Sequence, residues 1–172
     1  MPLGLDQNLT EKDYQGLLTA LDKTALVSMT DNKGNILYAN NKFIEVSKYS
    51  LPELFGQNHR ILKSHQQPDE VFVDLWKTIS SGQVWRGEIK NRAKDSTYYW
   101  VDTSIAPILG SDGKPERYIS VRFLITDKKN VEEAEKKRSE EIEKMNKFMI
   151  DRELKMVELK REIDNSKKQP PF

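Results

Sequence analysis

The last quarter of the chain has a composition that restricts it to one kind of structure. Residues 128–169 contain neither glycine nor proline and are dominated by Glu, Lys and Arg. Glycine and proline are the residues that most strongly interrupt helices, so this segment predicts one continuous helix over residues 128–166, followed by a tail at 167–172. The composition changes sharply after Asp127, which separates this helix from a globular part.

Apolar residues recur along this helix at alternating steps of three and four, the a/d spacing of a coiled coil. The seam consists of Ile142, Met145, Met149, Arg152, Met156, Leu159 and Ile163. A lone helix would leave the apolar members in water, so the spacing predicts a parallel homodimer. Arg152 puts a charge into the seam, which weakens a coiled coil and suits a helix that shifts register during signalling. A single solvated helix is the alternative.

The preceding residues alternate between strand-like and helix-like patterns. Thr10 is the expected N-cap of a flanking helix within residues 1–24. Two β-prone runs, 25–29 and 35–39, are joined by a segment whose Asn and Gly suit a tight hairpin. The other expected elements are two short helical pieces, the longest helix of this part and three strands: 40–48, 50–53, 69–81, 84–92, 97–108 and 116–126.

This order of elements predicts an α+β fold with a five-stranded antiparallel sheet and helices on one face. Turn-rich connectors at 94–96 and 110–115 favour pairing between successive strands. Helices that interrupt the strands leave room for a pocket between helix and sheet. We therefore expect a flanking helix at 1–24, one domain at 25–127, a coiled-coil helix at 128–166 and a tail at 167–172.

The charge balance argues against several partners. The chain has 28 basic and 27 acidic residues, interleaved along its 172 positions, for a net charge of +1. Such a balance gives no electrostatic footprint for nucleic acid or an anionic membrane. There are no cysteines and no stretch approaching a transmembrane span, so we expect a soluble, cytoplasmic protein.

Catalytic patterns are also missing from the sequence. No catalytic triad, paired carboxylates, phosphate-binding loop or metal-ligand spacing is apparent. The length allows one domain with a core and excludes a conventional kinase or cyclase beside it. We therefore expect no enzymatic activity from this chain.

Six segments together carry a family resemblance: Asn35-Ile-Leu-Tyr-Ala-Asn-Asn-Lys-Phe43, Tyr49-Ser-Leu-Pro-Glu-Leu-Phe-Gly56, Leu75-Trp76, Gly82-Gln-Val-Trp-Arg-Gly87, Asn91-Arg-Ala-Lys-Asp95 and Tyr99-Trp-Val101. With them, residues 25–127 resemble PAS domains, in particular the flavin-binding redox sensors of aerotaxis and nitrogen-fixation control. The segment 145–163 resembles the linker that follows PAS domains in sensor histidine kinases. Both histidines lie in the PAS-like part, so neither serves as a phosphoacceptor in this helix.

The resemblance implies a set of flavin-binding residues, each with a plainer alternative. Asn91 would bond the polar edge of the flavin ring, or else tie down a neighbouring loop. Trp85, Trp76 and Phe72 would supply flat apolar area, although core packing also explains such aromatics. The remaining candidates are polar and have helix capping or solvation as alternatives: Asn40, Asn58 and Arg60.

Two other cofactor classes fit less well. Blue-light LOV domains carry a cysteine that forms the flavin adduct, and the corresponding residue here is His59, which cannot form a thioether. Val101 and Arg122 stand where LOV domains have ring-binding amides; which sheet face Arg122 points to is ambiguous, because both faces of its strand carry apolar residues. His59 and His65 are the available ligands for a haem.

The leading interpretation is a sensory PAS module of bacterial signal transduction, as in two-component systems. It would bind FAD, with FMN and haem as alternatives, sense redox state or oxygen, and signal through its coiled coil to a downstream protein or transmitter domain. The rival interpretations are a cofactor-free PAS domain for dimerisation or interaction, and the sensor fragment of a histidine kinase.

Overall fold

The structure is a computed structural model that describes residues 10–167. The chain divides between Thr126 and Asp127 into two compact units. The domain bounds expected from the sequence stay predictions, and the expected tail lies outside the described residues apart from Lys167. No described helix has both the length and the apolar character needed to cross a membrane.

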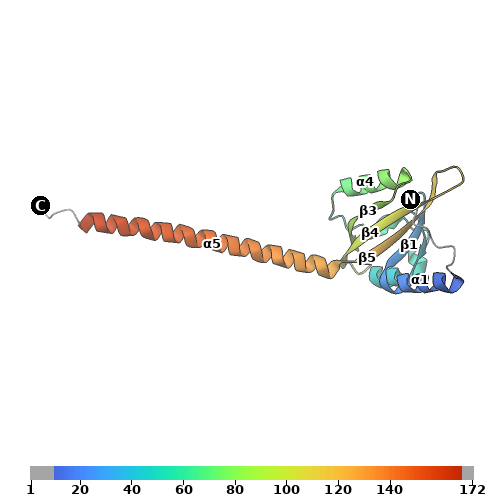
Figure 1. The fold of residues 1–172 in the computed structure, drawn as a ribbon, viewed down its shortest axis with the longest axis horizontal. Helices are drawn as coiled ribbons and strands as arrows, with labels where there is room; N and C mark the ends of the chain where they lie inside the picture. Colours follow the sequence, from blue (N-terminus) through green and yellow to red (C-terminus); the bar gives the residue numbers. More distant parts are fainter. Residues whose placement is uncertain (1–9, 168–172) are drawn as a thin grey trace. The chain divides into compact units, whose positions relative to one another are not determined.

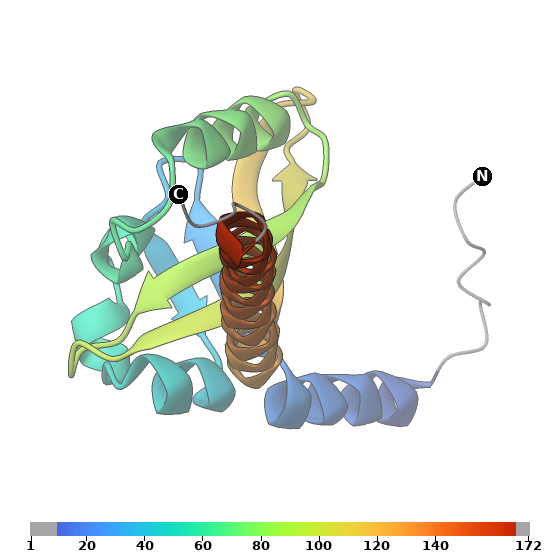
Figure 2. The same ribbon diagram turned by 90° about the vertical axis from the view of Figure 1, so that its left-hand side faces the viewer.

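The first unit begins with the helix α1 (Glu11–Thr24) and the hairpin strands β1 (Leu26–Asp31) and β2 (Ile36–Ala39). Short helical elements follow: α2 (Asn41–Ser47), α3 (Leu51–Leu54) and the 3-10 turn η1 (His59–Leu62). The longer helix α4 (Asp69–Ser80) leads into β3 (Trp85–Arg92), β4 (Tyr98–Leu109) and β5 (Pro115–Leu124). In both ribbon views α1 and α4 lie at opposite ends of this unit (Figures 1 and 2).

The five strands form one antiparallel sheet in the order β2-β1-β5-β4-β3. The β1–β2 and β3–β4–β5 pairings are those expected between successive strands. The β1–β5 pairing, which joins the two groups at the centre of the sheet, had no local sequence signal; it aligns Ser28 with Ser120. The structure thus confirms the α+β architecture.

Local chemistry explains the element boundaries. Thr10 caps α1, and its side chain and that of Asp13 form a reciprocal capping box. The β1–β2 turn is held by Asp31, whose carboxylate accepts from the backbone N–H groups of Lys33 and Asn35. Gly34 in this turn has a φ of +85°, a left-handed conformation that glycine adopts without strain.

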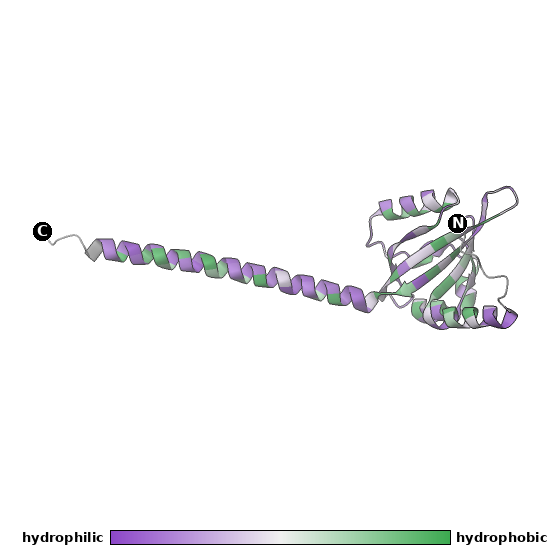
Figure 3. Ribbon diagram, in the orientation of Figure 1, coloured by the Kyte–Doolittle hydropathy of each residue, from purple (hydrophilic) through white to green (hydrophobic). Residues whose placement is uncertain are grey.

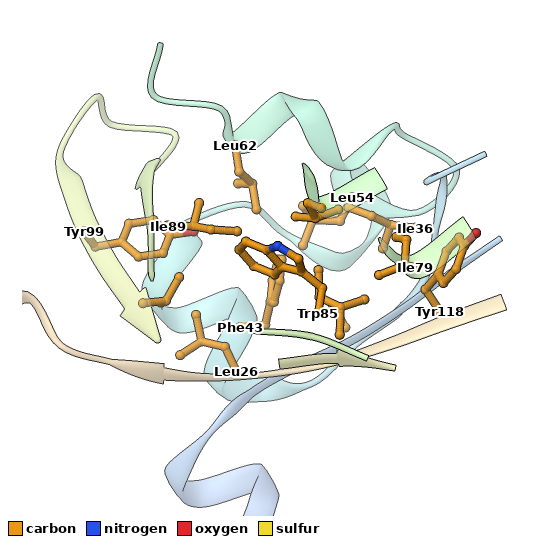
Figure 4. Packing of buried hydrophobic residues seen from close by; sticks show 14 of the residues in the cluster. Leu26, Ile36, Phe43, Leu54, Leu62, Ile79, Trp85, Ile89, Tyr99 and Tyr118 are labelled. Atoms are coloured by element: carbon orange, nitrogen blue, oxygen red, sulfur yellow. The ribbon is translucent and has the colours of Figure 1, made fainter. Parts of the chain in front are cut away.

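One face of the sheet carries the core. Figure 4 shows the buried cluster, to which Phe43, Leu62, Trp85 and Ile89 all belong. Alternate residues of each strand point to this face, as the period of two requires. On β5 these are Tyr118, Ser120 and Arg122, all of them buried.

The second unit is the single helix α5 (Thr126–Lys167). Hydrophilic residues dominate its surface, with separate apolar patches along it (Figure 3). From residue 130 to residue 165 every side chain is exposed, including those of the expected coiled-coil seam. The long C-terminal helix is confirmed; its pairing with a second copy stays a prediction.

Candidate functional site

A cavity of about 740 Å³ lies between the core face of the sheet and the elements that cover it. Its walls come from β1, the β1–β2 turn, η1 and the segment after it, α4, β3, β4 and β5. The lining residues are Thr30, Lys33, Gly34, Asn58, His59, Arg60, Lys63, His65, Phe72, Leu75, Trp76, Ile79, Ile89, Asn91, Ile105, Tyr118, Ser120 and Arg122. The volume lies within the range of ordinary small-molecule sites.

Asn91 lies where the sequence placed it, on the cavity side of β3. Its side chain is 5% exposed and lines the cavity together with Ile89, two residues earlier on the same strand face. The backbone of Asn91 also bridges to Lys63 in the segment after η1. A loop therefore does pack against Asn91, so its contact with a cofactor stays a prediction.

Two of the three aromatic candidates also line the cavity, and both come from α4. The Trp76 indole stands edge-on to the Tyr118 ring, with centroids 5.9 Å apart, and is 39% exposed. It lies against Gly34, where a Cβ atom would come within 3.0 Å of the indole. Phe72 is partly buried and carries the Lys63 ammonium 4.7 Å above its ring.

The third aromatic candidate, Trp85, packs in the core and does not line the cavity. Its indole lies over Gly87, where a Cβ atom would approach to 2.6 Å, and its Nε1 donates to Asp74 at 2.9 Å. Strand parity placed Trp85 correctly on the face of Asn91. The indole turns along the sheet toward α4, which periodicity alone could not show.

Asn40 is buried and makes three hydrogen bonds within the protein. Its Oδ1 accepts from the backbone N–H groups of Val27 and Phe43, both at 3.0 Å, and its Nδ2 donates to the Ala25 carbonyl. It caps α2 and fixes that helix to β1. The structure thus gives Asn40 the capping role and places it outside the cavity lining.

Asn58 and Arg60 line the cavity near the exposed β1–β2 turn. The Asn58 amide donates to the Lys33 carbonyl at 2.9 Å, and its oxygen accepts from Arg60 Nε at 2.9 Å. Asn58 thereby caps η1 and ties it to the turn. The exposed guanidinium of Arg60 makes no ion pair with a described residue.

The buried end of the cavity holds a residue that the sequence left unplaced. Arg122 on β5 is 4% exposed, and its terminal nitrogens bond Ser28 Oγ and His59 Nε2, both at 3.0 Å. Its Nε is buried without a hydrogen-bond partner. The sequence signal was weak because Ile119 and Val121 make the other face of β5 look equally buried; the shared parity of Arg122 with Ser120 was the available clue.

This arrangement fixes the protonation of His59. Arginine can only donate, so His59 Nε2 accepts and the ring carries its proton on Nδ1. Burial and the adjacent Arg122 lower the pKa of His59 well below its ordinary value of 6.5. A neutral imidazole whose Nε2 is already bonded is poorly placed to ligate haem iron. No cluster of three or more potential metal ligands occurs in residues 10–167.

The lining is strongly cationic. It includes Lys33, Arg60 and Lys63 near the rim and Arg122 at the buried end, and no carboxylate among the described residues. The Lys63 ammonium pairs with Asp69 at 2.6 Å, outside the cavity. A ligand of this cavity therefore meets apolar and aromatic walls together with positive charge at both ends.

Residues 36–122 match the family described as the PAS fold. The chain belongs to the PAS family. This match covers half of the chain and runs from β2 into β5, a stretch that supplies most of the residues lining the cavity. The PAS domain is a sensory domain of signalling proteins, and no catalytic domain is evident among the described residues.

Similarity to individual proteins agrees with this family. The aerotaxis receptor of Escherichia coli K12 is 40% identical over 62% of this chain and 21% of its own length. The nitrogen fixation regulatory protein of Klebsiella pneumoniae is 35% identical over 71% of this chain and 25% of its own. An RNA-binding Light-Oxygen-Voltage receptor has a similar fold, with a TM-score of 0.65 and 19% identity over 78% of this chain and 39% of its own. The chain thus spans a quarter or less of these curated relatives.

Proposed function

We propose that the PAS unit binds a flavin, FAD, in its cavity and reports redox state or oxygen to a downstream signalling protein in the cytoplasm. The observation that supports this most is the combination of an apolar, aromatic cavity with a buried amide and a cationic rim. A bound flavin would supply reversible electron transfer; the protein would bind and orient it and limit its contact with water.

The walls fit the flavin ring system. An isoalloxazine is flat and apolar on its faces and carries hydrogen-bonding atoms along one edge. Phe72, Trp76 and Ile89 offer flat or branched apolar area, and Asn91 offers an amide that can both donate and accept. A buried Asn facing an apolar cavity favours a ligand with polar atoms at that point.

The rim fits the phosphate end of the cofactor. Lys33, Arg60 and Lys63 bring three cationic side chains to the cavity within one stretch of turn and η1. Arginine and lysine are the usual partners of phosphate groups, by bidentate bonds and point charge respectively. FAD has two phosphates and FMN one. The resemblance to the redox sensors favours FAD.

The output is proposed to pass through α5. The a/d spacing from Ile142 to Ile163 and the exposure of every side chain in that stretch support a parallel homodimer. In this proposal the chain is a module without catalytic activity of its own. Its downstream partner is a transmitter domain or a separate signalling protein.

The deciding experiment is the visible spectrum of the full chain as purified. We expect the bands of oxidised flavin, lost on reduction with dithionite and regained in air. Heat release followed by chromatography against FAD and FMN standards identifies the cofactor. A spectrum without visible absorbance, unchanged after incubation with FAD or FMN, would favour the cofactor-free interaction module, and a haem Soret band would favour the haem alternative.

A further inference from the structure

Arg122 is a buried cation whose partners are all neutral. Its two terminal nitrogens bond a serine hydroxyl and a neutral histidine, and its Nε, buried as well, has no hydrogen-bond partner in the described part of the chain. The Phe43 ring, 5.7 Å from the guanidinium carbon, is also uncharged. The guanidinium therefore lines the cavity with its Nε–H unpaired and only one hydrogen bond on each terminal nitrogen.

Among residues 10–167, no carboxylate forms an ion pair with Arg122. Burial lowers the pKa of Arg122 to about 10, so it stays a cation at neutral pH. The phenol of Tyr99 on β4 interacts electrostatically with Arg122, but burial raises the pKa of Tyr99 to about 12, so it is neutral. The other titratable side chains lining the cavity are lysines, an arginine, histidines and the phenol of Tyr118, and none of them is a carboxylate. A buried charge without a partner is strongly unfavourable, so the site favours a ligand that brings a negative charge.

We infer that Arg122 is the counter-ion for an anionic group of the bound ligand and that, with flavin, it holds the reduced ring in its deprotonated form. This inference rests on the proposed flavin binding. The reaction it concerns takes two electrons from an added inorganic reductant, dithionite, and one proton from water to give a reduced ring with one negative charge. The second proton, which would neutralise the ring, is not taken up.

Arg122 then also biases the redox equilibrium. The oxidised ring is neutral and gains a hydrogen bond from Arg122, whereas the reduced anion gains a hydrogen bond and a charge pair. A site that binds one state more tightly shifts the equilibrium toward it by that difference in affinity. A preference of roughly ten- to a hundred-fold for the reduced state corresponds to a midpoint about 30 to 60 mV higher.

The test follows the midpoint potential of the FAD-loaded full chain against pH. A two-electron couple changes by about 30 mV per pH unit when it takes up one proton and by about 60 mV when it takes up two. The pH at which the slope changes is the pKa of the reduced ring. We expect this change of slope, or break, about one to two pH units lower in the wild-type protein than in free FAD. The bound reduced ring would then be a ten- to hundred-fold stronger acid than the free one.

Variants separate the charge of Arg122 from its packing. Arg122→Gln should return the break toward that of free FAD and lower the midpoint by about 30 to 60 mV. Arg122→Lys keeps the charge and should restore most of both effects. Arg117→Gln removes an exposed cation of the same strand that does not line the cavity; as a matched control it should leave the break in place. His59→Gln removes the other titratable group at this end, and a break retained there assigns the effect to Arg122.

Every result of this test either supports or overturns the assignment of Arg122 as the counter-ion. A wild-type break at the pH of free FAD, or an Arg122→Gln variant with the wild-type midpoint and break, overturns this inference and leaves flavin binding intact. A wild-type protein that takes up no flavin overturns both proposals. If Arg122→Gln fails to fold or to hold FAD, the wild-type break and the Arg122→Lys variant still give the answer.

Discussion

Large apolar side chains are buried in the core of the PAS unit but exposed along α5. In the PAS unit, the core face of the sheet and the facing sides of α2, α3 and α4 enclose a cluster of large side chains, with Phe43 1% exposed. In α5 the large side chains lie in water, with Phe148 69% exposed. The first unit buries its apolar core within itself, whereas the apolar seam of the second is exposed, which is why we propose that a second copy covers it.

The largest effect is expected for a pair of identical truncations, one in each unit. Phe43→Ala should lower the free energy of unfolding of the PAS unit by about 3 to 5 kcal/mol, because it leaves a cavity in a closed core. Phe148→Ala, outside the a/d seam, should change it by less than about 0.5 kcal/mol. Urea denaturation measures both. Equal effects would show that α5 is buried against something in solution.

A smaller effect separates two buried asparagines within the PAS unit. Asn40→Ala should destabilise the cofactor-free domain by about 1 to 3 kcal/mol, since two backbone N–H groups and one carbonyl lose their partner. Asn91→Ala should instead weaken flavin binding by roughly five- to a hundred-fold, a similar free energy, with little loss of fold.

The two variants act as controls for each other when flavin retention and apo melting are measured on both. Full flavin occupancy in Asn91→Ala together with a lowered apo melting temperature would assign Asn91 to holding the segment around Lys63. The contact between Asn91 and the cofactor would then have to be abandoned.

Acid should distinguish the enclosed unit from the exposed one. The fold lowers the pKa of His59 below its ordinary value of 6.5, so the folded protein favours the neutral imidazole. The unfolded chain takes up a proton at His59 when the pH falls below 6.5, whereas the folded protein does not. The stability that His59 provides is therefore present above pH 6.5 and is lost as the pH falls below this value. The loss should not exceed about 1.4 kcal/mol per pH unit.

His59→Gln keeps an acceptor for Arg122 and has no proton to gain, so its stability should be flatter over the same range. Denaturation at a series of pH values, with and without the substitution, gives the comparison. Parallel curves for the two proteins would mean that His59 is solvated in the folded state.

The smallest effect is expected from removing most of α5. A chain that ends at Lys129 should melt as cooperatively as the full chain and at nearly the same temperature, because the enclosed core lies before it. Sedimentation should find the full chain a dimer and the shortened chain a monomer. A monomeric full chain would remove the coiled coil from the proposal.

The sequence predicted those parts of the fold that local patterns encode. The Thr10 cap, the hairpin around Gly34, the helix from Asp69 and the three last strands each follow from spacing within about a dozen residues. The β1–β5 pairing joins segments with no local signal, so the sheet order could not be derived. The 3-10 turn η1 was likewise missed, since four residues are too few for a periodicity.

The candidate site was predictable to the level of strand parity and no further. Parity placed Asn91 on the cavity side, and helical spacing placed Phe72 and Trp76 there. These two periodicities could not show that the Trp85 indole lies over Gly87, or that the Asn40 side chain caps a helix and is therefore already hydrogen-bonded. Arg122 was missed because apolar residues occupy both faces of β5, and burial of a charge is the opposite of what hydropathy predicts.

The pairing of the first strand with the last has a consequence for how the domain comes to fold on the ribosome. Ser28 and Ser120 bond across a separation of 92 residues. Until β5 leaves the exit tunnel, β1 has one edge unpaired, and the face that will hold Arg122 and Ser120 does not exist. Contacts this distant in sequence slow folding, because the loop must close before they are gained. The sheet and the cavity are thus completed together, when β5 pairs with β1. A cofactor can bind in the cavity only after β5 has been synthesised.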